Sequence, residues 1–313
     1  MERGQIKFYD IGDYLSRGEK LAIVDRLGSV AGIDAEMGWE SITPDEHGDW
    51  RNQRDTGFTD FIALGEKDDP HSLKIFENYS SGVKTQRDAW CINGSRDALS
   101  VNVAGMIDFY NGEVERFGRR LPVEQRKQRE AAVDAFVDAT PSNISWSTNL
   151  KNELVKGRKL QFDPSKPIQS LYRPFTYQWL YYSRDLNERT YQMARIFPDA
   201  TSANRVICIA GTGAQKSFSC IQTKAIPDLH AIQTGQCFPR YVYDEDAAFS
   251  DEPQDSLLHR TESKGGRLRR DALTDQALAH FRAMYPGEDI TKDDLFDYVY
   301  GLLHSEDYRD RFK

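Results

Sequence analysis

The sequence lacks several features that would assign it to a particular compartment. It has no apolar run near the roughly 20 residues that a membrane-spanning helix needs, and its N-terminal residues include no apolar stretch typical of secretion signals. Its four cysteines are widely separated and form no CxxC pair, and no histidine completes a zinc site with them. These absences predict a cytoplasmic protein in a reducing compartment, with no membrane partner and no bound metal.

The signatures of several enzyme classes are also missing. The segment 206–217, VICIAGTGAQKS, looks like a strand that leads into a phosphate-binding loop, but Ala210 and Gln215 occupy the two positions where that loop needs glycine. A turn between two strands is the favoured interpretation. The sequence has no Pro-Pro pair for an adenine-gripping loop, no GxGxxG after a strand and no GxSxG elbow. We therefore predict no catalytic and no cofactor-binding residue in this chain.

A metal-dependent nuclease remains one alternative. Such enzymes use an acidic residue followed by a Glu-x-Lys triplet, and Asp228 with Glu262-Ser263-Lys264 would supply those groups. The triplet lies in a polar, glycine-flanked stretch where no strand is expected to hold it rigid. Nuclease chemistry is therefore disfavoured.

The spacing of apolar residues predicts a mixed α/β protein of the α+β type. Short apolar runs between 159 and 243, punctuated by Pro, Gly and Asn, are typical of strands and turns. Thr291 and Asp294 form a start signal for the last major helix. The other expected helices, from apolar residues at helical spacing, cover about 12–28, 99–114, 122–139 and 145–157. We expect a helical N-terminal half, a β-rich middle and a helical C-terminal tail.

Charge is unevenly distributed along the chain. The net charge of −8 argues against a surface coated for phosphate binding. Residues 244–255 carry six acids and no base, however, whereas residues 259–270 carry five bases and one acid. A DNA-binding face needs only local positive potential, so the total charge does not exclude one. The alternative is that these stretches are solvated helix faces and loops.

Two further clusters combine polar and aromatic residues. Residues 80–90, SSGVKTQRDAW, place a Lys-Thr-Gln-Arg run after a glycine, and such side chains suit phosphate contact or the reading of base edges. The alternative is a loop in which Arg87 and Asp88 pair locally. Residues 171–182, LYRPFTYQWLYY, hold six aromatics and Arg173. We interpret them first as core or interdomain packing, because bulky aromatics mainly bury area.

Six phrases, in order, span almost the whole chain and carry a family resemblance. They resemble the C-terminal third of the single-polypeptide restriction-modification enzymes called Type ISP. The phrases are YDIGDYL (9–15), GDWRNQR (48–54), YSSGVKTQRDAW (79–90), YRPFTYQWLYY (172–182), PDLHAIQTGQCFP (227–239) and DLFDYVYGLLHSEDYRDRF (294–312).

The resemblance implies a target-recognition (specificity) region without catalysis of its own. In that family a nuclease, an ATP-dependent translocase and an adenine-N6 methyltransferase lie upstream, and only those modules would need S-adenosylmethionine, ATP and Mg²⁺. Residues 1–157 would be a helical or mixed segment adjoining the methyltransferase module, and 158–313 a β-rich target-recognition segment with C-terminal helices.

The expected function is therefore sequence-specific recognition of double-stranded DNA, which positions a target adenine for the methyltransferase in the same polypeptide. The alternative is a structural coupler that packs on the methyltransferase without binding DNA autonomously. Phosphate contacts would come from cations and base contacts from loops of the β-rich middle. The candidate DNA-binding residues are Lys84, Thr85, Gln86, Arg87, Arg173, Lys216, Arg240, Lys264, Arg267, Arg269 and Arg270.

Overall fold

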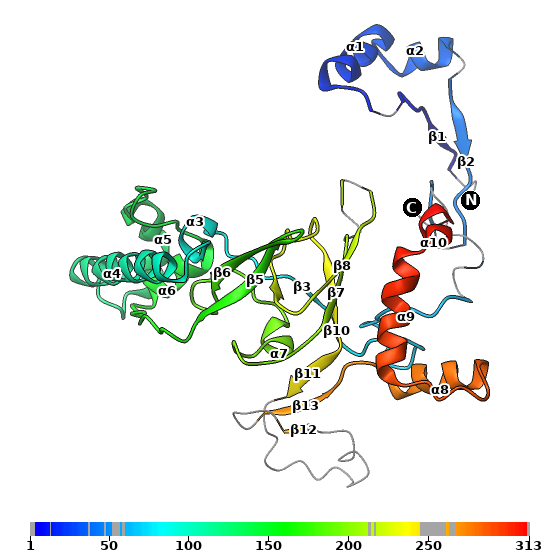
Figure 1. Ribbon diagram of the computed structural model, residues 1–313. Coiled ribbons are helices and arrows are strands. Elements are labelled where there is room, and N and C mark those ends of the chain that lie inside the picture. Colours follow the sequence, from blue (N-terminus) through cyan, green and yellow to red (C-terminus); the bar gives the residue numbers. More distant parts are fainter. Residues whose placement is uncertain are drawn as a thin grey trace. The chain divides into compact units, whose positions relative to one another are not determined.

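The computed structural model shows a chain with two compact units, residues 1–62 and 63–313 (Figure 1). Helices and small sheets both occur along the chain, which confirms the α+β class. Within the described part no helix is long and apolar enough to cross a membrane. The structure describes residues 4–12, 14–36, 38–46, 48–51, 57, 60–211, 214–215, 217–244, 261–262 and 267–311.

The first unit has one small sheet and two helices. Strands β1 (Ile6–Phe8) and β2 (Glu40–Ile42) pair antiparallel, and α1 (Arg17–Leu27) and α2 (Val30–Ala35) lie between them in sequence. A capping box of Ser16 and Glu19 starts α1. No residue of either helix is buried.

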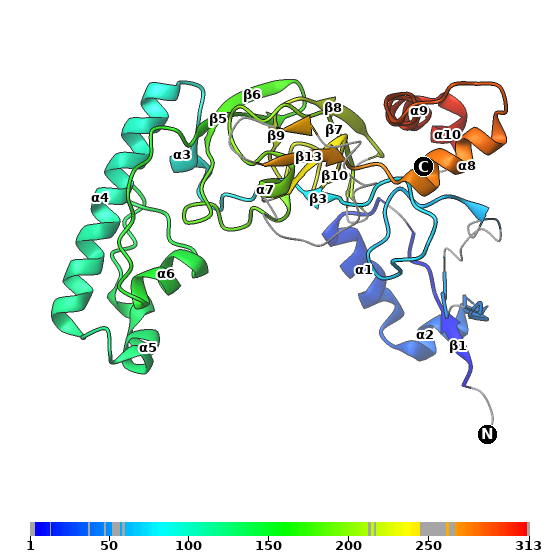
Figure 2. The same cartoon turned by 90° about the horizontal axis from the view of Figure 1, so that it is seen from below.

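The second unit begins with a helical layer around a long helix, α4 (Arg96–Arg120). The Ser95 hydroxyl caps α4 by accepting from the Ala98 amide. The apolar face expected at helical spacing is confirmed, because α4 buries it against the short helices beside it (Figure 2). Those helices are α3 (Asp88–Cys91), α5 (Arg126–Phe136) and α6 (Thr148–Val155). The same core takes in Tyr181 and Leu186, from beyond the domain boundary expected at 157/158, and that boundary stays a prediction.

Two four-stranded sheets form the β-rich middle. One has the order β4-β6-β5-β9, and the other has the order β3-β10-β7-β8. Val206–Ile209 and Cys220–Thr223 pair antiparallel as β7 and β8, which confirms the two strands that the favoured interpretation expected on either side of the connection. The remaining bounds are β3 Ser80–Ser81, β4 Ile92–Asn93, β5 Pro167–Arg173, β6 Thr176–Tyr181, β9 Ile226–Pro227 and β10 Gln236–Pro239, with α7 at Met193–Ile196.

A three-stranded sheet and the C-terminal helices complete the unit. The sheet has the order β11-β13-β12, formed by Tyr241–Asp244, Leu268–Asp271 and Thr261–Glu262. The predicted start of the last major helix is confirmed, because Thr291 and Asp294 form a capping box. The helices are α8 (Asp275–Met284), α9 (Lys292–His304) and α10 (Glu306–Arg311).

Candidate nucleic-acid interface

An extended segment follows β3 and is bonded on both of its edges. On one edge, the Val83 amide donates to the Pro227 carbonyl and the Leu229 amide donates to the Val83 carbonyl, each at 2.8 Å. On the other edge, the amides of Lys84 and Arg189 donate to each other's carbonyls, at 2.8 and 3.0 Å. Backbone pairing on two sides fixes the path of this segment.

The side chain of Arg87 anchors the same segment to the interior of the protein. Its side chain is buried, with Nε donating to the Ser145 carbonyl at 3.1 Å, Nη2 to the Ser147 hydroxyl at 2.6 Å, and Nη1 to the Leu186 carbonyl. Burial lowers the pKa of Arg87. The local pair with Asp88, one of the alternatives from the sequence, is replaced by these more distant partners. The phosphate contact predicted for Arg87 would require the segment to open.

Gln86 lies between the backbone-paired Lys84 and the buried Arg87, and its own backbone conformation is unusual. Its φ is +61°, in the left-handed region that few side chains adopt, and its side chain is exposed. Its neighbour Thr85 is buried and donates its hydroxyl to Asp88, which also accepts from the Tyr172 hydroxyl at 3.2 Å. Strain at an exposed position is typical of functional sites.

A pocket of about 240 Å³ opens beside Gln86. Lys84 supplies a cation, Gln86 an amide that both donates and accepts, and His230 an exposed ring. These groups suit contacts to base edges and phosphates. The residues that line the pocket are Lys84, Thr85, Gln86, Asp88, Asp228, Leu229 and His230.

Arg173 borders this pocket through an ion pair. Its Nη1 lies 2.8 Å from Oδ1 of Asp228, and its guanidinium lies 3.8 Å from the centre of the Tyr172 ring. Burial raises the pKa of Asp228, although the Arg173 charge and the His230 amide oppose that rise. The close packing here also requires Gly82, because a Cβ at that position would lie 2.4 Å from the Asp228 carbonyl oxygen. We name the segment 82–88 with this pocket the reading segment.

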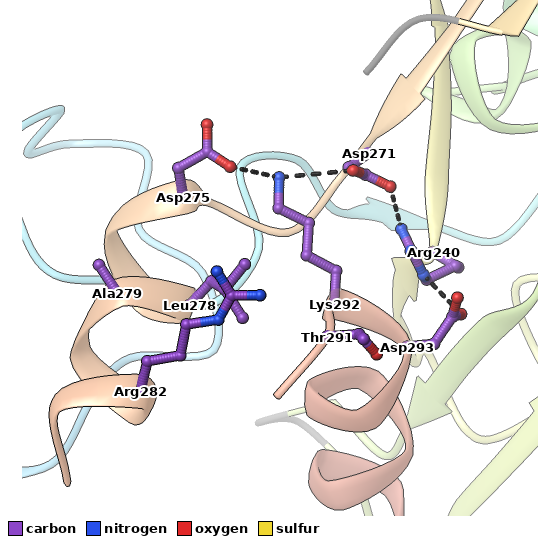
Figure 3. Close-up of a pocket in the computed structure, with 9 residues that line it drawn as sticks. All are labelled: Arg240, Asp271, Asp275, Leu278, Ala279, Arg282, Thr291, Lys292 and Asp293. Carbon is purple, nitrogen blue, oxygen red and sulfur yellow. Dashed lines mark hydrogen bonds and ion pairs between the residues drawn. The ribbon is translucent and has the colours of Figure 1, made fainter. Parts of the chain in front are cut away.

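Arg240 lies in a different environment, a network of ion pairs between β13, α8 and α9 (Figure 3). Its buried guanidinium contacts Asp271 and donates from Nε to Asp293 at 2.9 Å. Lys292 bridges Asp271 at 3.5 Å and Asp275 at 2.6 Å. A cavity of about 630 Å³ adjoins this network. We name this network of ion pairs the latch, because it joins the three-stranded sheet to α8 and α9. The DNA contact predicted for Arg240 stays a prediction.

Of the other cations predicted to contact DNA, three lie in or directly before β13 and two lie outside the described residues. Arg270 pairs with Asp244 and Glu77, and Arg269 lies 4.3 Å from the centre of the Tyr241 ring. Arg267 is partly exposed and directly precedes β13. The predicted contacts Lys216 and Lys264 lie outside the described residues, and so does the Lys264 of the nuclease alternative. Within the described residues no cluster of His, Cys, Asp and Glu could hold a metal ion.

The aromatic segment 171–182 has two parts with different environments. Leu171, Leu180 and Tyr181 are buried, as the packing interpretation expected. Phe175 and Tyr177, however, are 85% and 51% exposed. Sequence reasoning missed both, although Pro174 between two alternating runs is a turn signal that could have located them at a hairpin tip.

The chain is similar to one family and to several solved structures, including the three below. The model of the Type ISP C-terminal specificity domain matches residues 74–313. A search of curated proteins finds no match. The first structure is a nuclease-deletion mutant of the Type ISP restriction-modification enzyme LlaGI in complex with a DNA substrate mimic, at 33% identity and a TM-score of 0.76.

The other two structures are also complexes with DNA. They are the ATP-dependent Type ISP restriction-modification enzyme LlaBIII bound to DNA, with a TM-score of 0.74, and a DrdV–DNA complex, with a TM-score of 0.76, each at 27% identity. The matches cover 98–99% of this chain but only 25%, 18% and 27% of the LlaGI, LlaBIII and DrdV chains.

Proposed function

This chain belongs to the family of Type ISP C-terminal specificity domains, and from that membership we propose that it recognises a short sequence in double-stranded DNA. In this proposal it positions a target adenine for a methyltransferase module of the same polypeptide. S-adenosylmethionine, ATP and Mg²⁺ would serve the other modules. The three similar structures described above are complexes with DNA or a DNA mimic, which supports DNA as the partner.

The observation that carries the proposal is the construction of the reading segment. Both of its edges are hydrogen-bonded and Arg87 anchors it, while Gln86 faces outward beside Lys84. Base readout needs donors and acceptors held in a fixed geometry, since an amide aligned with adenine or a cation near guanine discriminates only when it is correctly placed. The phrase YSSGVKTQRDAW that carries the family resemblance also covers this segment.

A titration of the chain against double-stranded DNA tests the proposal. A labelled duplex pool of mixed sequence should bind at low salt, and selection from the pool should enrich one short sequence. Binding should weaken steeply with salt, because each neutralised phosphate contributes about 0.9 to the slope of log affinity against log salt. Absence of duplex binding at low salt would count against autonomous recognition.

A structural coupler is the second candidate, and one observation favours it. Helix α1 buries none of its residues, and its apolar side chains Leu21 and Val24 are 54% and 58% exposed. Exposed apolar side chains of this kind are typical of a helix that packs against another module. On this view the chain joins the methyltransferase and specificity arises only in the intact enzyme. The isolated chain would then bind no duplex, and replacement of Leu21 and Val24 by Ser would weaken its association with the methyltransferase module.

A further inference from the structure

The tip of the β5–β6 hairpin has an unusual residue in its turn. Arg173 pairs with Thr176, which leaves Pro174 and Phe175 as a two-residue loop. Phe175 has a φ of +59°. Proline at the first loop position suits a turn whose second position requires positive φ, and glycine or asparagine normally occupies that second position. Phenylalanine there is strained, because its Cβ crowds the backbone in the left-handed region.

Nothing in the described chain offsets the cost of this placement. The Phe175 side chain is 85% exposed, so burial of its ring does not compensate the strain. Tyr177, two residues further along, is 51% exposed. Glycine at position 175 would relieve the strain and remove the exposed apolar ring at once. A residue that is unfavourable on both counts is best explained by a contact outside the chain.

The base of the hairpin is fixed and adjoins the reading segment. Arg173 is bonded to Asp228, and the Tyr172 hydroxyl donates to Asp88. Both of these acids line the pocket beside Gln86. Phe175 follows Arg173 by two residues, so their Cα atoms lie at most about 7 Å apart, the length of two fully extended residues. The exposed ring therefore stands close to the groups that would contact DNA.

We propose that Phe175 is a wedge that stacks against, or inserts between, base pairs of DNA bound at the reading segment. The inference rests on the proposed function and adds a contact that carries no sequence information itself. Every base has an aromatic face on which a ring can stack, and apolar side chains that enter a base step unstack it and kink the duplex. The charged and polar surroundings, Arg173, Lys84 and Gln86, fit a nucleic acid better than an apolar protein surface.

The test compares Phe175→Gly and Phe175→Trp with wild type and with Val101→Ala, which changes an exposed residue of α4. Two probes are used: a mixed-sequence duplex, and the same duplex with a central abasic site. Wild type should bind the abasic duplex more tightly, because its stack is already open. Phe175→Gly should bind the intact duplex about 5- to 150-fold more weakly, in line with the loss of one stacking contact.

The variants separate a wedge from a structural role. Phe175→Gly should lose the preference for the abasic duplex while unfolding at a higher temperature than wild type. Phe175→Trp should keep the affinity, and DNA binding should quench more tryptophan fluorescence in this variant than in wild type. Val101→Ala should behave as wild type. If Phe175→Gly binds both duplexes as wild type does, the wedge is refuted while DNA recognition stands. If wild type binds neither duplex, the proposed function is overturned, and the wedge with it.

Discussion

The reading segment and the latch look alike in sequence but use their cations differently. Both contain arginine among polar residues, and both were expected to contact phosphate. In the reading segment, the buried Arg87 bonds mainly to backbone carbonyls, and Lys84 and Gln86 stay at the surface. In the latch, Arg240 is neutralised by Asp271 and Asp293. The number of basic residues therefore does not measure the positive potential that DNA would meet.

The largest effect is expected at Arg87, which holds the reading segment in place. Arg87→Ala leaves the carbonyls of Ser145 and Leu186 without their charged donor, so unfolding free energy should fall by about 3 kcal/mol or more. Chemical denaturation measures this loss, with Gln86→Ala as the matched neighbour, expected within about 0.5 kcal/mol of wild type. Equal losses in the two variants would show that Arg87 is not the anchor of the segment.

Arg240 should come second, because part of the latch is open to solvent. Arg240→Ala removes a buried guanidinium from Asp271 and from Asp293, whose side chain is 53% exposed. We expect a loss of about 2 kcal/mol in unfolding free energy, below the range for a fully buried pair. Arg126→Ala, which breaks an exposed pair with Glu130, should cost about 0.5 kcal/mol or less. A similar cost for both arginines would mean that the latch does not stabilise the fold.

DNA binding should separate the two regions directly. Lys84→Gln should reduce the salt slope of duplex binding by about 0.9 and weaken binding by about 1 kcal/mol, as expected for the loss of one phosphate contact. Arg270→Gln should leave both quantities unchanged, because that guanidinium is already paired with Asp244 and Glu77. A larger change in slope for Arg270→Gln than for Lys84→Gln would show that DNA contacts strand β13 in preference to the reading segment.

How much of the fold and of the candidate site could be predicted from the sequence depends on how far apart along the chain the interacting residues lie. The face of α4 and the cap at Thr291 were predicted, because they depend on neighbours within a few positions. The burial of Arg87 was not, since its partners lie 58 to 99 positions away. The exposed Phe175 was missed for another reason: aromatics are usually buried, and residue propensities do not predict a strained turn that holds one outside.

The pH dependence of stability should have opposite signs in the two regions. Hydrogen bonding to Arg240 holds the pKa of Asp293 below 3.8, so its contribution is present above the unfolded-state pKa and is lost as pH falls through the folded one. Burial raises the pKa of Asp228 above 3.8, so its contribution is present below the unfolded-state pKa and is lost as pH rises through the folded one.

Denaturation of the two Asn variants across the acid range measures these signs. The stability advantage of wild type over Asp293→Asn should shrink on acidification. Its advantage over Asp228→Asn should shrink as the pH rises. Parallel profiles for the two variants would show that the two carboxyl groups share one kind of environment.

The smallest effect is expected from Gln86, and it is the most informative about the reading segment. Because Gln86 has a φ of +61°, Gln86→Gly should relieve strain and raise unfolding free energy by about 0.5 kcal/mol, whereas Gln86→Ala keeps the strain. Both variants lack the amide, so both should lose discrimination between sequences while retaining salt-dependent binding to mixed duplexes. A segment that only supports the fold would give the stability difference without any loss of discrimination. Gln86→Gly should stabilise the fold and remove sequence readout at the same time. It therefore separates a structural role of Gln86 from a role in readout, which a destabilising variant could not do.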